Sequence, residues 1–479
     1  MKFLKALFVL ALVVAFAAPA YAETQNVKVS GSVDIYHFYR NNFDLVDGND
    51  AGTSAVGSGV PGASHGSSFN DRSEGDDWFM TITQIEVAAD LTDNVSTVIN
   101  LINQRDWNAG FEEDDEFSSA DGSEFNVGID LAYVQMREIF YAPLTLTIGR
   151  QDLLFGRGFI IGWNPQNYAG NGIEAIEFTQ EQAFDAIRAT LDFNPWTLDF
   201  VYSKIDENTH NAEDDKDLYI ANVNYKFSDY NAVAEVYWMT ENDRSTLSTT
   251  GVDTGDTRNN DTHTIGGRVQ FDPISQITLG AEIAYQFGHF RASTDDLERD
   301  RSAWALDVFG EYRWDMEWKP MIGIEYVHLS GEEDLSSTAE DYNAWNGAYR
   351  GPVYGWIQDY REAYWESGFG GDQIAGQNIQ HISIYGSIQP MSDLKLTANW
   401  FYFWADETQH LIPTDPSSPE LDDEIGWELD TAIIYSYTED VTFSFYANWF
   451  VPGDTFSSPD DEDVDATASE YISRVTVTF

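Results

Sequence analysis

The last nine residues of the chain, 471–479, carry a regular alternation of apolar and polar side chains. Successive side chains of a β-strand point to opposite faces. One face of this segment holds Tyr471, Ser473, Val475, Val477 and Phe479, and the other holds Ile472, Arg474, Thr476 and Thr478. The pattern therefore predicts a strand with one mostly apolar face and one mostly polar face, ending on an aromatic residue.

Similar alternation recurs from residue 26 onward, separated by turn residues and polar stretches. It predicts about 18 strands, most of them long enough to cross a bilayer at a tilt. We expect strands at 26–40, 76–90, 95–105, 126–139, 144–153, 184–193, 196–205, 217–227, 230–241, 262–272, 276–290, 302–314, 318–329, 378–389, 393–405, 424–437, 440–451 and 468–479.

The connections between these strands alternate between short and long. Short turns are expected at 91–94, 194–195, 228–229, 273–275, 390–392 and 439. Long loops are expected at 41–75, 106–125, 154–183, 242–261, 330–377, 406–423 and 452–467. Short periplasmic turns and long external loops are typical of bacterial outer-membrane barrels. The rhythm predicts an even number of antiparallel strands, with both ends of the chain on the periplasmic side.

The first 22 residues have the features of a cleaved secretory signal. Lys2 and Lys5 precede an apolar run, and Ala20-Tyr21-Ala22 precedes Glu23. No later segment approaches the roughly 18 apolar residues of a membrane helix, and a secreted chain without one can span a membrane only as a closed barrel. We predict a leader at 1–22 and one transmembrane antiparallel β-barrel domain at 23–479, in the Gram-negative outer membrane. The strand at 471–479 then resembles the closing strand read by the barrel-assembly machinery.

Composition agrees with this class and excludes others. Aromatic residues make up 15% of the chain, as expected for interfacial aromatic girdles around a wet lumen. The chain contains no cysteine, which excludes disulfides, thiolate metal sites and attached c-type haem. With 81 acidic against 25 basic residues, the net charge is −56. Such a surface repels nucleic acid, attracts cations and keeps exposed loops hydrated.

Two loops concentrate the acidic residues. Segments 106–125 and 452–467 carry runs of Asp and Glu without Lys or Arg. Carboxylates bind hard cations such as calcium, but neither run has the Asp, Asn and Gly spacing of a dedicated calcium loop. We therefore expect no metal site and no cofactor. Loop 330–377 is instead rich in aromatic residues: Tyr342, Trp345, Tyr349, Tyr354, Trp356, Tyr360, Tyr364 and Trp365. It could stack on sugars or form a self-packed plug, and the plug is the favoured interpretation.

Several of the few basic residues occupy alternate strand positions that should face the lumen. They are Arg137, Arg268, Lys395 and Arg474. One interpretation is a set of positive charges that selects anions, as charged rings do in other pores. The alternative is that these side chains pair with lumen carboxylates and stiffen the wall, because charges inside a membrane are usually paired. The pattern leaves both open.

A motif near residue 150 resembles a known family. Gly149-Arg150-Gln151 ends a predicted strand, Phe155-Gly156 and Trp163 follow, and Phe184-Asp-Ala-Ile-Arg188 begins the next strand. This segment resembles the alginate-export family of outer-membrane barrels. The resemblance implies an 18-stranded monomeric porin in which Arg150 and Arg188 face the lumen and contact an anionic substrate. In the alternation itself, however, Arg150 shares parity with the apolar Leu146 and Ile148.

The expected function is therefore a passive outer-membrane channel for hydrophilic solutes, either small molecules or a polysaccharide, and anions among them. The family member that exports alginate is expected to have a strongly electropositive lumen, whereas this chain has few bases, so alginate does not follow as its cargo. Two alternatives belong to other classes. One is a barrel that sheathes a partner such as an electron-carrying cytochrome, and the other is a barrel enzyme. No hydrolase or metalloprotease motif supports the second, so we predict no enzymatic activity. Expected partners are outer-membrane lipid and the solute, with no nucleic acid.

Overall fold

The computed structural model describes most of the predicted barrel. Its described residues are 26–43, 45, 76–107, 127–141, 143–164, 173, 175, 178–207, 215–244, 260–290, 299–332, 341–351, 355–358, 377–408, 420, 422–456 and 466–479. The predicted leader at 1–22 lies outside this set and stays a prediction. Within the described residues, no helix is both long and apolar enough to cross a membrane.

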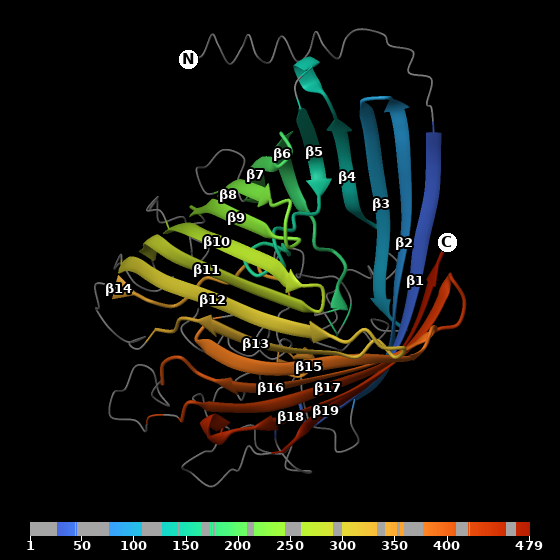
Figure 1. Cartoon of the computed structure of the whole chain (residues 1–479), viewed down its shortest axis with the longest axis vertical. Helices are drawn as coiled ribbons and strands as arrows, with labels where there is room; N and C mark the ends of the chain where they lie inside the picture. Colours follow the sequence, from blue (N-terminus) through green and yellow to red (C-terminus); the bar gives the residue numbers. More distant parts are fainter. Residues whose placement is uncertain are drawn as a thin grey trace, which may run out of the picture.

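The predicted all-β architecture is confirmed (Figure 1). The wall strands are β1 (Asn26–Asn41), β2 (Asp76–Thr92), β3 (Val95–Asp106), β4 (Gly128–Met136), β5 (Leu144–Gln151), β6 (Phe184–Asp192), β7 (Trp196–Asp206), β8 (Lys216–Lys226), β9 (Val233–Asp243), β10 (Asn260–Ile274), β11 (Ile277–Phe290), β12 (Arg299–Arg313), β13 (Met321–Leu329), β15 (Ile379–Met391), β16 (Leu394–Trp404), β17 (Glu424–Ser436), β18 (Val441–Pro452) and β19 (Ala468–Thr478). The two-residue strand β14 (Asp341–Tyr342) pairs in parallel with β12. Two 3-10 turns, η1 (Ile139–Tyr141) and η5 (Asp454–Phe456), complete the described elements.

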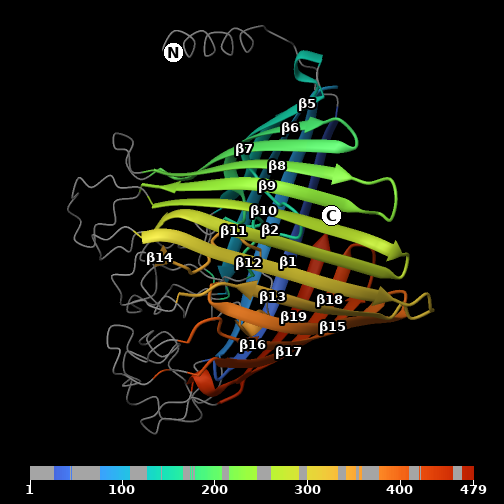
Figure 2. The same ribbon diagram turned by 60° about the vertical axis from the view of Figure 1, so that its left-hand side comes forward.

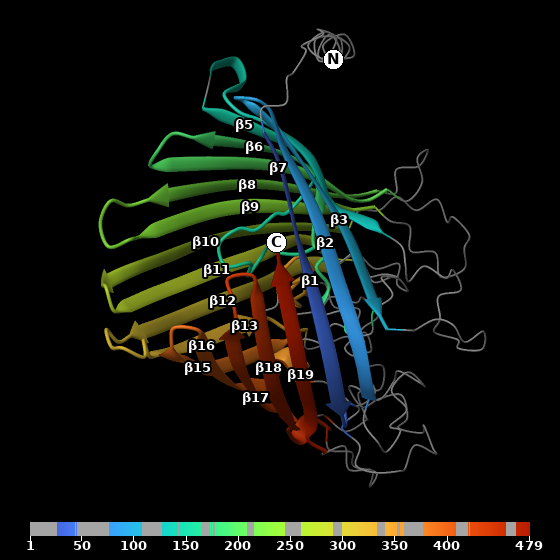
Figure 3. The same ribbon diagram turned by 90° about the vertical axis from the view of Figure 1, so that its right-hand side faces the viewer.

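The wall strands form one closed antiparallel sheet of 18 strands. Each wall strand pairs with its neighbours in sequence, and β1 pairs with both β2 and β19. Figure 3 shows β19 lying beside β1 near the C-terminus. The closing seam includes Phe479, whose N–H and carbonyl exchange hydrogen bonds with Gly31 at 3.0 and 2.9 Å. Closure leaves no unpaired strand edge facing lipid, which is the condition for a sheet to cross a membrane.

The two faces of the wall differ as the alternation predicts. On β19, Phe479 and Val477 share the outward face, whereas Glu470, Ile472 and Arg474 face the lumen. Many outward side chains around the wall are large, apolar and exposed, as expected for a lipid-facing surface. The strand positions therefore separate a lipid face from a lumen face.

The two ends of the barrel also differ. In Figure 2 the hairpins that join β6 to β7, β8 to β9 and β10 to β11 lie at one end, which we call the turn end. The opposite ends of these strands lie at the other end of the barrel, which we call the loop end. The largest buried apolar cluster lies inside the barrel toward the loop end and includes Phe184, Leu218, Val327, Phe403 and Phe450. The core of this protein is thus a filled half of the lumen, not the wall itself.

Candidate channel lumen

The Gly149-Arg150-Gln151 motif ends β5 and turns the chain into the lumen. Gly149 has φ +123°, and a Cβ there would lie 2.2 Å from the carbonyl oxygen of Ala132, so only glycine fits. The Gln151 amide donates to the carbonyl oxygens of Gly149 and Ala186 at 3.1 and 2.9 Å. Pairing between β4 and β5 stops at Ala132 and Arg150. The motif therefore has a structural role: it ends the ladder so that residue 152 onward can enter the barrel.

The chain that enters after β5 packs against a second inward segment. Leu153, Phe159 and Ile161 are buried in the lumen cluster. The N–H groups of Gly162 and Trp163 donate to the Tyr349 carbonyl at 2.8 and 3.1 Å. We call the described residues 152–164, 341–351 and 355–358 the plug.

The aromatic loop predicted to form a plug contributes its second segment. Trp345 and Tyr349 are almost fully buried in the lumen cluster. The Gln286 side chain on β11 accepts from the Asn346 N–H at 2.8 Å and donates to the Asn346 carbonyl at 2.9 Å. Of the aromatic residues that define the prediction, Tyr354, Tyr360, Tyr364 and Trp365 lie outside the described residues. Trp345, Tyr349 and Ile357 of this loop therefore pack inside the barrel.

A line of charged residues crosses four consecutive strands of the lumen wall. Glu235 on β9, Arg268 on β10, Glu282 on β11 and Asp307 on β12 are direct cross-strand partners. Arg268 Nη1 lies 3.1 Å from Glu235 Oε1, and the Tyr237 hydroxyl donates to Glu282 at 2.9 Å. Arg268, predicted to face the lumen, does so in this line. Acidic residues outnumber basic ones there.

Arg157 brings a positive charge from the plug to this line. Its Nη1 lies 3.0 Å from Asp307 Oδ2 and 2.6 Å from Glu325 Oε1. Its guanidinium lies 4.0 Å from the centre of the Phe309 ring, within range of a cation–π interaction. Burial lowers the pKa of Arg157, but Glu325 and Asp307 together raise it above its ordinary value. Sequence reasoning missed this residue because the alternation of a strand does not extend into a loop.

Two other predicted lumen arginines also pair with carboxylates. Arg188 Nε lies 2.8 Å from Asp199 Oδ1. Arg474 contacts Asp34 Oδ1 through Nε at 2.9 Å and Nη2 at 2.7 Å, over the Tyr36 ring. The pairing interpretation of the basic residues is therefore what the geometry shows for Arg188, Arg268 and Arg474.

The remaining three predicted site residues lie outside these ion pairs, and of the three only Lys395 has the lumen position predicted for it. Arg137 is exposed just beyond β4 at the turn end, where its Nε donates to Gln135 at 3.0 Å. Lys395 is exposed on the lumen face of β16, also at the turn end. Arg150 differs from the lumen position that the resemblance implies. Its Nη1 lies 3.6 Å from Asp185, which shares the outward face of β6 with the exposed Ile187. Its position follows the strand alternation.

The exposure of the two partners differs in four lumen ion pairs, which three arginines form. The side chains of Arg157, Arg188 and Arg474 are 33%, 28% and 27% exposed. Their carboxylate partners Asp307, Glu325, Asp199 and Asp34 are 3%, 7%, 5% and 3% exposed. In each pair the arginine side chain is therefore the partner that a passing solute can reach.

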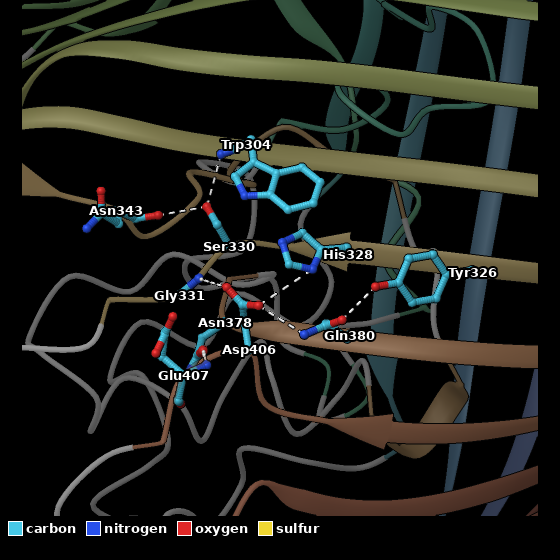
Figure 4. A network of polar contacts seen from close by, with 10 residues as sticks. All are labelled: Trp304, Tyr326, His328, Ser330, Gly331, Asn343, Asn378, Gln380, Asp406 and Glu407. Atoms are coloured by element: carbon cyan, nitrogen blue, oxygen red, sulfur yellow. Dashed lines mark hydrogen bonds and ion pairs between the residues drawn. The ribbon is translucent and has the colours of Figure 1, made fainter.

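A separate polar network lies on the outward face at the loop end (Figure 4). His328 stacks on Trp304 at 3.8 Å, and its Nδ1 lies 3.6 Å from Asp406. Asp406 also accepts from the Gly331 N–H at 3.0 Å and the Gln380 amide at 2.9 Å. The Ser330 hydroxyl donates to the Asn343 carbonyl at 2.7 Å. These contacts fasten the segment after β16 to β13 and β15.

The described residues contain no group of three or more His, Cys, Asp or Glu side chains placed to hold a metal ion. Most of acidic segments 106–125 and 452–467 lies outside the described residues. The expectation of no metal and no cofactor therefore stays a prediction.

Comparison with known proteins decides the family. A model of the alginate export family matches residues 67–469, most of the chain. The chain belongs to the alginate export family. This family member is a β-barrel channel of the bacterial outer membrane through which solutes pass passively. No curated protein matches its sequence.

Solved outer-membrane proteins of Pseudomonas aeruginosa share the fold of this family member. OccK9 (OpdG) is 10% identical, with a TM-score of 0.53 over 95% of this chain and 99% of its own. OccK2 (OpdF), solved in complex with glucuronate, is 9% identical, with a TM-score of 0.52 over 95% and 98%. OpdK, solved with vanillate, is 10% identical, with a TM-score of 0.51 over 95% and 100%. At these identities the likeness concerns the fold.

Proposed function

We propose that this channel passes small hydrophilic organic anions. The observation that carries the proposal is the exposure of Arg157, Arg188 and Arg474 above carboxylates that are nearly buried. A solute in the lumen meets the guanidiniums first, and a guanidinium presents planar donors that match a carboxylate. The buried partner reduces the attraction, so an anion can bind and leave, as conduction requires.

The plug favours small solutes over a polymer. Its two segments pack against each other and fill the loop half of the lumen with buried side chains. A polyuronate chain would also need a continuous positive track, whereas the arginines here are individually paired. Glucuronate and vanillate, bound in two of the similar barrels, are small carboxylates of the kind we propose. The plug occupies the space that a sheathed partner protein would need, which supports a channel over a sheath.

Further parts of the proposal concern assembly. We propose that the protein acts as a monomer, because each barrel is closed through β1 and β19 and encloses its own lumen. The exposed apolar outward face would contact outer-membrane lipid. The C-terminal strand would be the segment that the assembly machinery reads.

The test is ion selectivity in a planar bilayer. Arg188→Gln removes the exposed positive charge and leaves Asp199, so the reversal potential in a salt gradient should shift toward cation preference. The matched control, Arg188→Gln with Asp199→Asn, removes both charges and should shift it less. Identical reversal potentials for wild type and both variants would refute the role of the exposed guanidinium. In Arg188→Gln, uptake of a small carboxylate should fall relative to uptake of an uncharged sugar of similar size.

A further inference from the structure

Two carboxylates on β17 hold the plug by its backbone. Glu428 accepts hydrogen bonds from the N–H of Ile357 at 2.8 Å and from the N–H of Gln358 at 2.9 Å, one on each oxygen. Asp430 Oδ2 accepts from the N–H of Trp356 at 3.2 Å. Ile357 and Glu428 are both fully buried. Because Glu428 and Ile357 are removed from water, breaking these hydrogen bonds would leave buried polar atoms without partners, so this is a firm attachment.

The surroundings of Glu428 show that the wall itself does not need a carboxylate there. Its cross-strand partners are Phe401 on β16 and Phe450 on β18, both buried. A buried carboxylate between two aromatic rings is costly unless its oxygens are paired, and an apolar residue of similar volume would suit the site as well or better. The backbone N–H groups that donate to its two oxygens belong to the plug. The identity of residue 428 is therefore explained by the plug and not by the barrel.

The plug side is shaped to receive this carboxylate. A Cβ at Gly355 would lie 2.3 Å from the carboxyl carbon of Glu428. With glycine at this position, the backbone comes close enough for residues 357 and 358 to reach both oxygens, and a larger residue would have to displace the Glu428 carboxylate. Complementary features thus occur on both partners, which are separated by about 70 residues in sequence.

The attachment reaches the rest of the plug through direct contacts. The Trp356 ring stacks on Phe178 at 4.9 Å, and Phe178 in turn contacts Tyr36 and Phe38 on β1. The Gly351 N–H donates to the Gly158 carbonyl at 2.8 Å and so joins this segment to the one that carries Arg157. A shift of residues 355–358 would therefore disturb both inward segments.

From these contacts we infer that Glu428 and Asp430 are positioning residues that set the size limit of the channel by holding the plug in the lumen. They act through the plug and need not touch the solute. The inference depends on channel activity but not on the anion preference proposed above.

The experiment measures single-channel conductance and the uptake of uncharged sugars of increasing size into liposomes. Glu428→Leu with Asp430→Asn removes the attachment and suits the neighbouring aromatic rings. We expect larger conductance and entry of sugars that wild type excludes. Because each lost hydrogen bond leaves a buried polar group without a partner, the ratio of held to released plug should fall by roughly tenfold per bond. Glu428→Gln keeps one acceptor oxygen and should give an intermediate result.

Two controls separate the plug from general damage. Glu424→Gln changes a carboxylate on the same strand that accepts from the Tyr402 hydroxyl outside the lumen, and it should leave the size limit unchanged. Gly355→Ala pushes the attachment apart from the plug side and leaves the wall intact, so it should enlarge the limit even if the β17 variants fail to assemble.

The chain has no cysteine, so a reversible lock can be added cleanly. Gln286→Cys with Asn346→Cys places thiols on the wall and the plug, at residues that exchange hydrogen bonds. Joining them with a short thiol-reactive cross-linker in the Glu428→Leu, Asp430→Asn background should restore the wild-type limit. An unchanged size limit and conductance in Gly355→Ala and in the folded β17 variants would overturn the inference. Sugars carry no charge, so this outcome is independent of the selectivity test.

Discussion

The loop half and the turn half of the lumen are built from the same strands but have different interiors. On β16, Phe401 and Phe403 face the lumen at the loop end and are buried, whereas Thr397 and Lys395 face it at the turn end and remain accessible. The described plug residues share a buried cluster with the first pair, whereas Lys395 of the second pair is exposed. One half of the barrel is therefore a protein core, and the other is a wet pore wall. Stability and conduction should respond differently to changes in the two halves.

The largest effect on folding is expected at the end of β5, where the chain leaves the wall and enters the lumen. Gly149→Val forces a β-branched residue into φ +123° and toward the Ala132 carbonyl, in a seam of only five residue pairs between β4 and β5. The strain from φ alone is about 1–3 kcal/mol before the overlap is counted. We expect no folded barrel, measured by heat-modifiable migration in gels. Gly310→Ala, whose added Cβ meets only a flexible leucine side chain, should fold normally.

The next largest effect is on the free energy of unfolding, and it compares the loop half and the turn half of the lumen on one strand, β16. Phe403→Ala empties a fully buried position beside Phe401 and His381, and should lower the free energy of unfolding by about 3–5 kcal/mol. Thr397→Ala, on the same face of β16 at the turn end, should change it by no more than about 0.5 kcal/mol. Denaturant titration of the refolded proteins in detergent measures both. Equal losses would show that the turn half is also packed.

A smaller effect is expected on the outward face at the loop end. Asp406→Ala removes the acceptor for the Gly331 N–H and the Gln380 amide, and should cost about 1–3 kcal/mol. Because the contacts of Asp406 with Gly331 and Gln380 lie on the outward face, conductance should stay at the wild-type level. A change in conductance without loss of stability would mean that this network supports the plug.

The smallest effect on stability and ion selectivity is expected in the turn half of the lumen. Lys395 is exposed on the lumen face. Lys395→Gln should leave stability within about 0.5 kcal/mol and shift the reversal potential slightly toward cations, less than Arg188→Gln. A larger shift than that of Arg188→Gln would place the selective charge at the turn end.

The alternation of side chains was sufficient to predict the strands, their number and the orientation of β19, because water or the plug on one face and lipid on the other impose a period of two. It also indicated the outward parity of Arg150, against the lumen role implied by family resemblance. It could not predict Arg157 or the plug contacts. Glu428 and Ile357 meet across about 70 residues, and nothing in the pattern near either residue encodes the other. At the loop end the alternation of apolar and polar residues also becomes weaker, because lumen-facing residues such as Phe401 and Phe403 are apolar like the lipid-facing ones.

The carboxylates paired with Arg157, Arg188 and Arg474 have a consequence for how this channel could diversify. Asp199, Asp34 and Asp307 already lie behind the guanidiniums that a solute meets. Loss of one arginine would uncover a group of opposite sign at the same place, with no new residue required. A single nucleotide change could thus reverse the local polarity of the pore, and relatives with opposite ionic preference would lie one mutational step apart.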